Sequence, residues 1–344
     1  MELHEIVICP EGPFGTPIRG DTLFGHFCWQ VQYEPGLVEG GLPSNIARYG
    51  EQPFIVFSSA FPRFESASGQ VSYALKRPNA PLSWLFSSEG ESGLAQALRR
   101  KSNKRRTWML VSDELRPELD KARFLSDEEL LSEVSNFGAL DPYMLDARQL
   151  LFRCSRVHNT IHRITNTTGP GEFSPYNTEI SFYVSGVHLA IFALFDETVT
   201  NIEAVKEGLQ RIGQLGFGMD ASIGMGRFSV QATRLMTLPG AGEGAGMYCL
   251  SPSVPVPGSY KRAYFTPFVR FGKHGDTLAR STNPFKNPVI MADEGAVFVP
   301  KDPAAFSRPY WGRAVTNVSL TMPETVVQGY SIWLPMRLGG RGEA

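Results

Sequence analysis

Residues 12–29 read GPFGTPIRGDTLFGHFCW, a segment with Gly and Pro that runs directly into an apolar helical pattern. From Asp21 onward, apolar residues such as Leu23 and Phe27 recur at helical spacing, which predicts an α-helix with Asp21 as its N-cap. Residues 2–9, just before this segment, alternate as a strand does. The stretch therefore marks a strand-to-helix junction at the start of a β-α unit.

Further strands and a second helix are predicted later in the chain. PFIVFSSAFP (53–62) and HLAIFALF (188–195) are β-rich apolar runs, and RFSVQATRL (227–235) closes the series. Between the last two lies an amphipathic helix that begins after Thr200 or Asn201 and ends at Gly216. The resulting order of strand, helix, strand, strand, helix, strand is the ferredoxin-like pattern.

Two segments interrupt this pattern. Residues 76–150 are polar with helical windows and predict a helical insertion, while residues 154–178 are rich in Thr and Ile and predict an extended hairpin arm. Glycines at 239–246 predict a linker, and the strand-like runs of 247–338 predict a second, β-rich domain. We therefore expect an α+β protein with a first domain over 1–238 and a second that is a degenerate ferredoxin-like copy.

Composition limits the possible functions. The 344 residues include 42% hydrophobic and 19% charged residues with a net charge of −1, which is typical of a folded protein and excludes a uniformly basic surface. The four cysteines are scattered without a CxxC pair, so we expect no metal, no disulfide framework and no cofactor. The start of the sequence does not resemble a signal peptide, and we expect a cytoplasmic protein without a membrane span.

The loop DASIGMGR (220–227) is the first candidate site. Its glycines permit close backbone approach, its amides can point at phosphates, and an arginine stands at its exit, which together suit a nucleic-acid backbone. From the loop alone, a tight turn without a ligand is the simpler interpretation. The residues that we assign to RNA binding here are Ser222, Ile223, Gly224, Met225, Gly226 and Arg227.

Two further segments contribute candidates. Thr16, Arg19 and Gly20 lie at the start of the first helix, where unpaired amides and the helix dipole favour an anion. His162 and Arg163 lie on the predicted arm and are RNA-facing candidates, although a purely structural hairpin is equally consistent with the pattern.

A basic run at 99–106 could contact RNA or a neighbouring subunit, with Trp108 beside it able to stack on a base, although such a run is usually a solvated face.

Histidines raise a competing interpretation. His26 lies one turn into the first helix, and His158 and His162 form an HxxxH pair. In an extended chain the pair is too far apart to chelate zinc, and His26 among aromatic residues is better explained as a packed or a surface side chain. We assign no catalytic and no metal-binding residue.

Three segments together resemble the RAMP superfamily of CRISPR proteins, and within it the fourth subunit of the Csm complex, of the Cas-five-like group. They are the 12–29 junction, the 220–228 loop DASIGMGRF and the closing runs KNPVIMADEGAVFVP and VVQGYSIWLPMRL. The resemblance implies two ferredoxin-like domains and a non-catalytic subunit that binds the repeat-derived 5′ tag of the crRNA. It further implies contacts with the RAMP backbone subunit and the large palm-domain subunit.

Two alternatives stay open at this point. One is a metal-independent endoribonuclease that processes repeat RNA and uses the histidines. The other is the equivalent subunit of a type III-D or type IV complex.

Overall fold

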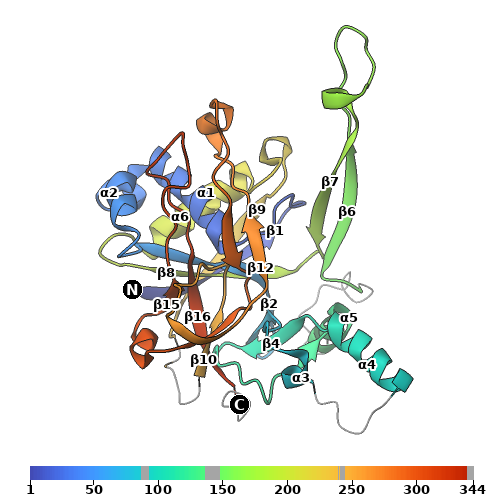
Figure 1. Cartoon of the computed structure of the whole chain (residues 1–344), viewed down its shortest axis with the longest axis vertical. Coiled ribbons are helices and arrows are strands. Elements are labelled where there is room, and N and C mark those ends of the chain that lie inside the picture. The colour runs from blue at the N-terminus through green and yellow to red at the C-terminus, as the bar shows by residue number, and fades with distance from the viewer. Residues whose placement is uncertain (87–92, 136–147, 239, 241–244, 339–344) are drawn as a thin grey trace.

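The structure, a computed structural model, describes residues 1–86, 93–135, 148–238, 240 and 245–338. Figure 1 shows two β-sheet halves packed together, a long hairpin arm that projects from the body, and a group of short helices beside the arm's foot. Among the described residues, no helix is both long and apolar enough to span a membrane.

The first half contains the predicted strand–helix–strand–strand–helix–strand order. Its strands lie in the order β2-β8-β1-β9, and every neighbouring pair is antiparallel. Helices α1 and α6 pack against each other and against this sheet. The bounds are β1 Glu2–Pro10, α1 Gly20–Tyr33, β2 Ile55–Glu65, β8 His188–Phe195, α6 Ile202–Leu215 and β9 Phe228–Met236.

Helix α1 forms for the predicted reason but begins differently. Leu23, Phe24 and Phe27 are buried in the main core, as the helical spacing requires. The prediction that Asp21 is the N-cap is wrong, because the N-cap is Arg19 and Asp21 lies inside the first turn. Asp21 faces the second half of the molecule, where Arg270 donates two hydrogen bonds to its carboxylate, at 2.6 and 2.9 Å.

The predicted helical insertion is only partly helical. Strand β3 pairs with β2, and β4 and β5 extend the sheet further, to seven strands. The short run VSYALK forms β3 and the short run WMLVS forms β4. The helical windows nearby in the sequence concealed them. The bounds are β3 Val71–Lys76, α3 Leu82–Leu85, α4 Gly93–Arg105, β4 Trp108–Ser112, β5 Phe124–Leu125 and α5 Asp127–Ser135, with α2 Gly41–Arg48 earlier in the chain.

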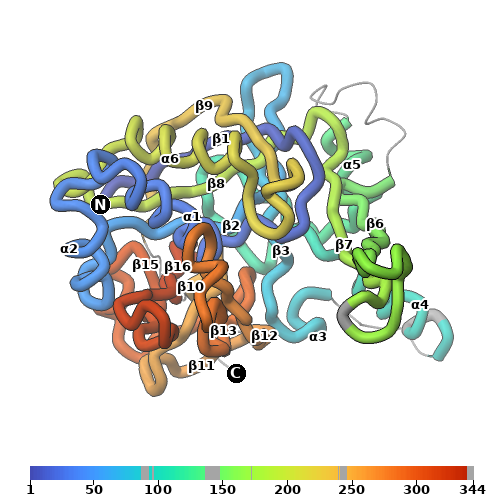
Figure 2. Tube along the Cα trace, turned by 90° about the horizontal axis from the view of Figure 1, so that it is seen from above, coloured from blue at the N-terminus to red at the C-terminus, as the bar shows by residue number. Residues whose placement is uncertain are grey.

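The hairpin arm predicted at 154–178 is present and slightly longer. Strands β6 (Leu151–His158) and β7 (Tyr176–Tyr183) pair along their full length and carry the tip away from the body. Figure 2, seen from above, places the arm at one side of the molecule, away from α2.

The second half is β-rich, as predicted. It contains a five-stranded sheet in the order β11-β14-β10-β16-β15 and a separate pair, β12-β13. Of the linker predicted at 239–246, residues 239 and 241–244 lie outside the described residues, and β10 already begins at Ala245. The bounds are β10 Ala245–Cys249, β11 Tyr260–Tyr264, β12 Pro267–Arg270, β13 Val289–Ala292, β14 Val297–Pro300, β15 Tyr310–Gly312 and β16 Tyr330–Arg337. The 3₁₀ turns are η1 Pro35–Leu37, η3 Gly171–Phe173, η4 Ala221–Ile223, η5 Asp276–Arg280 and η6 Pro303–Ser307.

The two halves share one core. Apolar residues of β10 and β16 belong to the same buried cluster as the first sheet. The buried amide of Gln328 both accepts a hydrogen bond from the Phe57 N–H and donates one to the Phe57 carbonyl, at an irregularity in β2. These contacts leave little freedom for one half to move against the other.

An ionic cluster adds to this junction. Arg19 pairs with Asp293 and Glu294, and Lys76 approaches the same two carboxylates. Burial raises the pKa of Glu294, but the charges of Lys76 and Arg19 outweigh burial and hold that pKa at about 2. Glu294 is therefore ionised at neutral pH and binds the first half to the second.

Candidate nucleic-acid interface

The glycine-rich loop after α6 has a conformation that depends on its glycines. Helix α6 ends at Gly216 with φ of 101°, and the chain then takes positive φ values again at Gly224 and Gly226. A Cβ on Gly226 would lie 2.1 Å from the carbonyl oxygen of Phe217. The loop is therefore a fixed structure rather than a flexible connection.

Most of the loop's amides bind protein acceptors. The Gly218 N–H donates to Nε2 of His26 at 3.2 Å, the Met219 N–H to Oγ1 of Thr16 at 3.0 Å, and the Gly226 N–H to the carbonyl of Pro13 at 2.7 Å. The sequence suggested that the loop's amides hold a phosphate. The amides of Gly218, Met219 and Gly226 are not free to do so, because they already bind protein acceptors. Their bonds fasten the loop to the strand-to-helix junction instead.

His26 is the anchor of this arrangement. Its ring packs against Phe217 with centroids 4.7 Å apart. Burial, with a smaller effect of the positive charge on Lys286, lowers the pKa of His26 to about 4. The ring is therefore neutral at pH 7, and its Nε2 can accept the Gly218 bond. The prediction of a packed histidine is confirmed.

The outer turn of the loop is open to solvent. Ile223 is 58% exposed, and Ser222 and Arg227 are exposed beside it. Within the described chain, Arg227 has no carboxylate partner. Met225 is only 1% exposed, so the expectation that its side chain faces RNA is wrong: the chain turns inward after Gly224 and places Met225 in the protein interior.

The start of α1 is not an open anion site. Gly20 is buried, and a Cβ on it would lie 2.1 Å from the carbonyl oxygen of Phe57. Arg19 is held by its acidic partners and lies over the ring of Phe268, 4.7 Å from its centroid. The second half of the chain thus covers this helix end. This contradicts the expectation that Arg19 and Gly20 bind RNA. Thr16 contacts the loop through its Oγ1, which accepts the hydrogen bond from the Met219 N–H.

The arm presents a mixed surface of cations and rings. At its tip Arg163 is exposed, and His162 packs edge-on against Phe173 at 4.7 Å. At the end of β6, His158 stacks on Tyr176 with ring centroids 5.2 Å apart. The arm therefore offers flat faces near positive charge, which suits bases and phosphates of a single strand.

Sequence reasoning missed two arm residues. Arg153 and Arg156 lie on β6, and both are exposed. Neither has an ion-pair partner among the residues that the structure describes. The signal was the run FRCSRVH, where an arginine recurs three positions after the first in a predicted strand.

The loop and the arm's foot are both attached to the strand-to-helix junction. Phe14 exchanges two backbone hydrogen bonds with Ser181 of β7, at 2.8 and 2.9 Å, and its neighbour Pro13 accepts the bond from Gly226. The junction thus connects the loop on one side to the arm on the other. We define Ser222, Ile223 and Arg227 together with Arg153, Arg156 and Arg163 of the arm as the loop–arm surface. Because Arg153 and Arg156 are three residues apart on β6, their side chains point to opposite faces of the arm.

The histidines form no common site. His26 lies under the loop, whereas His158 and His162 lie on the arm, where His158 bonds Thr178 and His162 bonds Thr165. Among the described residues, no cluster of His, Cys, Asp or Glu could hold a metal ion.

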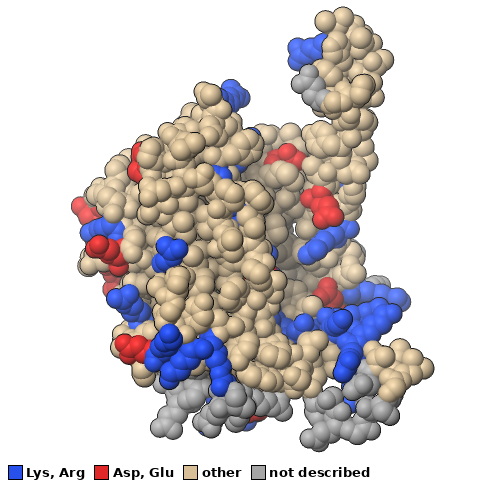
Figure 3. All heavy atoms as spheres, in the orientation of Figure 1, with Lys and Arg blue, Asp and Glu red and all other residues tan. Residues whose placement is uncertain are grey.

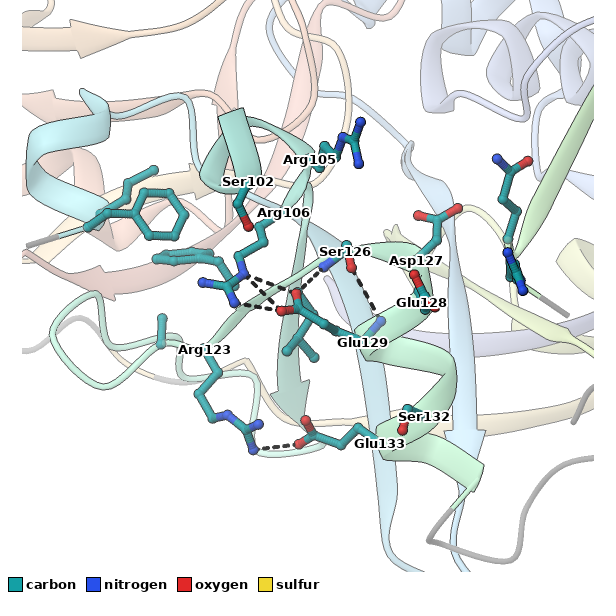
Figure 4. Close-up of a pocket in the computed structure, with 17 residues that line it drawn as sticks. Ser102, Arg105, Arg106, Arg123, Ser126, Asp127, Glu128, Glu129, Ser132 and Glu133 are labelled. Carbon is teal, nitrogen blue, oxygen red and sulfur yellow. Dashed lines mark hydrogen bonds and ion pairs between the residues drawn. The ribbon is translucent and has the colours of Figure 1, made fainter. Parts of the chain in front are cut away.

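The basic run 99–106 forms the last part of α4 and the residue after it. Trp108 does not extend it as a stacking platform, because its ring is half-buried and its Nε1 donates to Asp127 at 2.6 Å. Figure 4 shows the neighbouring cavity of about 1290 Å³. Two ion pairs lie along it: Arg106 binds Glu129, and Arg123 binds Glu133. Glu129 also accepts a hydrogen bond from the Ser126 N–H where helix α5 begins, so this carboxylate has a structural role.

No protein-family model and no curated protein matches the chain. Solved structures do match it. A chain of the Csm1–Csm4 cassette in complex with pppApA matches with a TM-score of 0.51 and 15% identity, over 98% of both chains. The same cassette in complex with cA4 matches with a TM-score of 0.51 and 16% identity, over 97% of both chains.

A third match is the Csm3–Csm4 subcomplex in the type III-A CRISPR-Cas interference complex. Its TM-score is 0.52 at 13% identity, over 96% of this chain and 99% of that one. These matches show that the chain shares its fold with a component of these complexes over nearly the whole of both chains. Csm4 is the component that both kinds of structure contain.

Proposed function

We propose that this chain is a non-catalytic, RNA-binding subunit of a type III CRISPR effector complex, which holds the repeat-derived 5′ tag of the crRNA. The observation that carries the proposal is the loop–arm surface. It combines arginines that have no acidic partner in the described part of the chain with an exposed apolar turn, on a Csm4-like fold. Such a surface binds a single strand through its phosphates and stacked bases.

The strand order of both sheets supports two ferredoxin-like halves. In the first half the order is β2-β8-β1-β9. If β10, β11, β14 and β16 are numbered one to four, the second sheet has the same order, with the helices replaced by irregular segments and short turns. We therefore assign 1–238 and 247–338 to two copies of one unit, the second degenerate.

Arg227 and Ile223 would contact different parts of the RNA strand. Arg227, without an acidic partner, would neutralise a phosphate, and Ile223 would pack against an unstacked base. Ser222 and Gly224 would let the strand approach closely. Arg163 and His162 at the arm's tip would contact a more distant part of the same strand.

The proposal includes the statement that this subunit is not catalytic. The buried, neutral His26 is held by the loop's backbone, and the arm's two histidines bind neighbouring threonines. A general acid–base pair needs two groups that converge on one substrate atom, and these three histidines are divided between two places.

Assembly with other subunits follows the related structures. Those structures contain Csm4 with Csm1 and Csm4 with Csm3. We propose that this chain likewise joins a RAMP backbone subunit to the large palm-domain subunit of its own complex.

Binding of tagged and untagged guide RNA to the chain, alone or within its reconstituted complex, tests the proposal. The double variant Ile223→Ser, Arg227→Ala should lower affinity for tagged RNA by about 10-fold or more, since a charge-assisted hydrogen bond from Arg227 to a phosphate contributes about 1.5–3 kcal/mol. The control Leu320→Ser, Arg280→Ala changes an exposed leucine and an exposed arginine of the second half and should bind normally. Equal affinity for tagged and untagged RNA would refute tag recognition.

A further inference from the structure

Helix α4 has a charge distribution that the proposed function does not explain. Its sequence, GLAQALRRKSNKR, contains five cations and no acid, although the whole chain has a net charge of −1. Figure 3 shows Lys and Arg gathered in this part of the molecule, at the lower right. The helix lies beside the foot of the arm, not at the glycine-rich loop (Figure 1).

The orientation of α4 is fixed by its inner side. Asn103 is buried, and Arg77 donates hydrogen bonds of 2.8 Å to the carbonyls of Asn103 and Arg106 at the helix end. These bonds satisfy carbonyls that a helix terminus leaves unpaired. Arg106, just past the helix, is held by Glu129. The helix therefore cannot turn its outer side toward the body.

The outer side carries four cations. Arg100, Lys101, Lys104 and Arg105 are all exposed, and over the chain that the structure describes none of them has an acidic partner. Arg100 with Lys104, and Lys101 with Arg105, are like-charge pairs at i, i+4, which destabilise an isolated helix. A surface that keeps such repulsion gains stability when a polyanion binds it. We call these four residues the α4 basic face.

The shape of the face suits a phosphate backbone. Small residues, Gly93 and Ala97, form the floor of a shallow hollow of about 470 Å³ whose other lining residues are Arg100, Lys101 and Lys104. From residue 100 to 105 the helix rises by about 7.5 Å. Successive phosphates of one strand advance by about 3.4 Å, so the face spans two or three of them.

We propose that the α4 basic face is a second nucleic-acid contact, which grips the phosphate backbone without reading its sequence. This contact extends the proposed function. It rests on the proposed function in one respect only, that the chain binds RNA. An acidic protein surface fits less well, because the lining of the hollow has no apolar side chain larger than that of Ala97.

Salt-dependent binding tests this inference on the full chain. The probe is a labelled single-stranded RNA of mixed sequence without the tag, titrated from about 50 to 200 mM salt. The variant Arg100→Gln, Lys101→Gln, Lys104→Gln, Arg105→Gln should reduce the log–log salt slope by about 1.4–2.1, the value for two or three phosphate contacts on a single strand. Across this range wild-type affinity should then fall about 7- to 18-fold more than that of the variant.

A charge-matched control separates local from global effects. Lys261, Arg280, Lys301 and Arg308 are exposed cations of the second half, and changing all four to Gln alters the net charge equally. The control variant should keep the wild-type slope. An unchanged slope in the α4 variant, or an equal reduction in both variants, would overturn the inference. So would normal RNA binding by an α4 variant that fails to assemble with its partner subunits.

The result is independent of the proposed tag recognition. An α4 variant should lose affinity for tagged and untagged RNA by the same factor, so the ratio between the two stays at its wild-type value. If that ratio is one already in the wild type, tag recognition fails, whereas the salt slope still decides whether α4 binds phosphates. Single-stranded DNA of the same sequence should behave like the untagged RNA, because the α4 basic face contacts phosphates rather than 2′-hydroxyls.

Discussion

The bond between His26 and the glycine-rich loop should make the stability of this protein depend on pH. In the folded chain the pKa of His26 is lowered, from 6.5 to about 4, first by burial and then by the charge of Lys286. Between these two values the unfolded chain binds a proton at this position and the folded chain does not. Stability must therefore rise as pH rises through this range.

The size of the effect follows from the shift. One pKa unit corresponds to about 1.4 kcal/mol, so the whole shift is worth about 3 kcal/mol, of which about 2 kcal/mol fall between pH 5 and 7. The variant His26→Gln isolates this contribution. The glutamine Oε1 can take the place of Nε2 and accept the Gly218 N–H, but it does not titrate in this range.

Urea unfolding followed by tryptophan fluorescence measures both proteins at a series of pH values. The free energy of unfolding of the wild type, minus that of His26→Gln, should increase by about 2 kcal/mol from pH 5 to pH 7. A difference that is flat with pH would refute the reasoning. So would an NMR titration in which the His26 ring protonates near its ordinary pKa, because the ring would then not be the buried acceptor that holds the loop.

Two further predictions concern the packing that supports the site. Arg270→Met should lower the free energy of unfolding by about 3–5 kcal/mol, because it leaves the buried Asp21 carboxylate unpaired. Asp21→Asn should lower it less, because Arg270 can reach solvent. Equal urea midpoints for the two variants would contradict this. Gly226→Ala should destabilise the fold by several kcal/mol, since its Cβ meets the Phe217 carbonyl, while Gly224→Ala should cost only the 1–2 kcal/mol of its positive φ. Thermal unfolding ranks these two, and the reverse order would show that the loop is not packed as described.

The regular part of the fold could be predicted because its signals are local. The helical spacing of α1 and α6 and the apolar runs of β1 and β8 decide their own structure, and Asn201 caps α6 as its position suggested. Strands β4 and β5 were missed for the opposite reason. They are two to five residues long, and only pairing with β3 makes them strands.

The candidate site was less predictable, since its residues are sorted by long-range contacts. Arg19 and Arg227 look alike in the sequence, yet Arg19 meets Asp293 and Glu294, more than 270 positions away, and Arg227 meets no acid in the described structure. Ile223 and Met225 are two residues apart in one loop, but one is exposed and the other is buried. The difference between the two arginines depends on how the two halves pack, and the difference between Ile223 and Met225 depends on how the loop folds back onto Pro13.

The central claim, that the loop–arm surface holds the tag, is tested most directly by photo-crosslinking. Guide RNA with 4-thiouridine in its tag is irradiated in the purified complex, and the attached tryptic peptides are identified by mass spectrometry. We predict crosslinks in residues 212–227, the peptide between Arg211 and Arg227 that contains Ile223, and in the arm between His158 and Tyr176. Crosslinks confined to α2 or to the second half, with none in these two segments, would contradict the account.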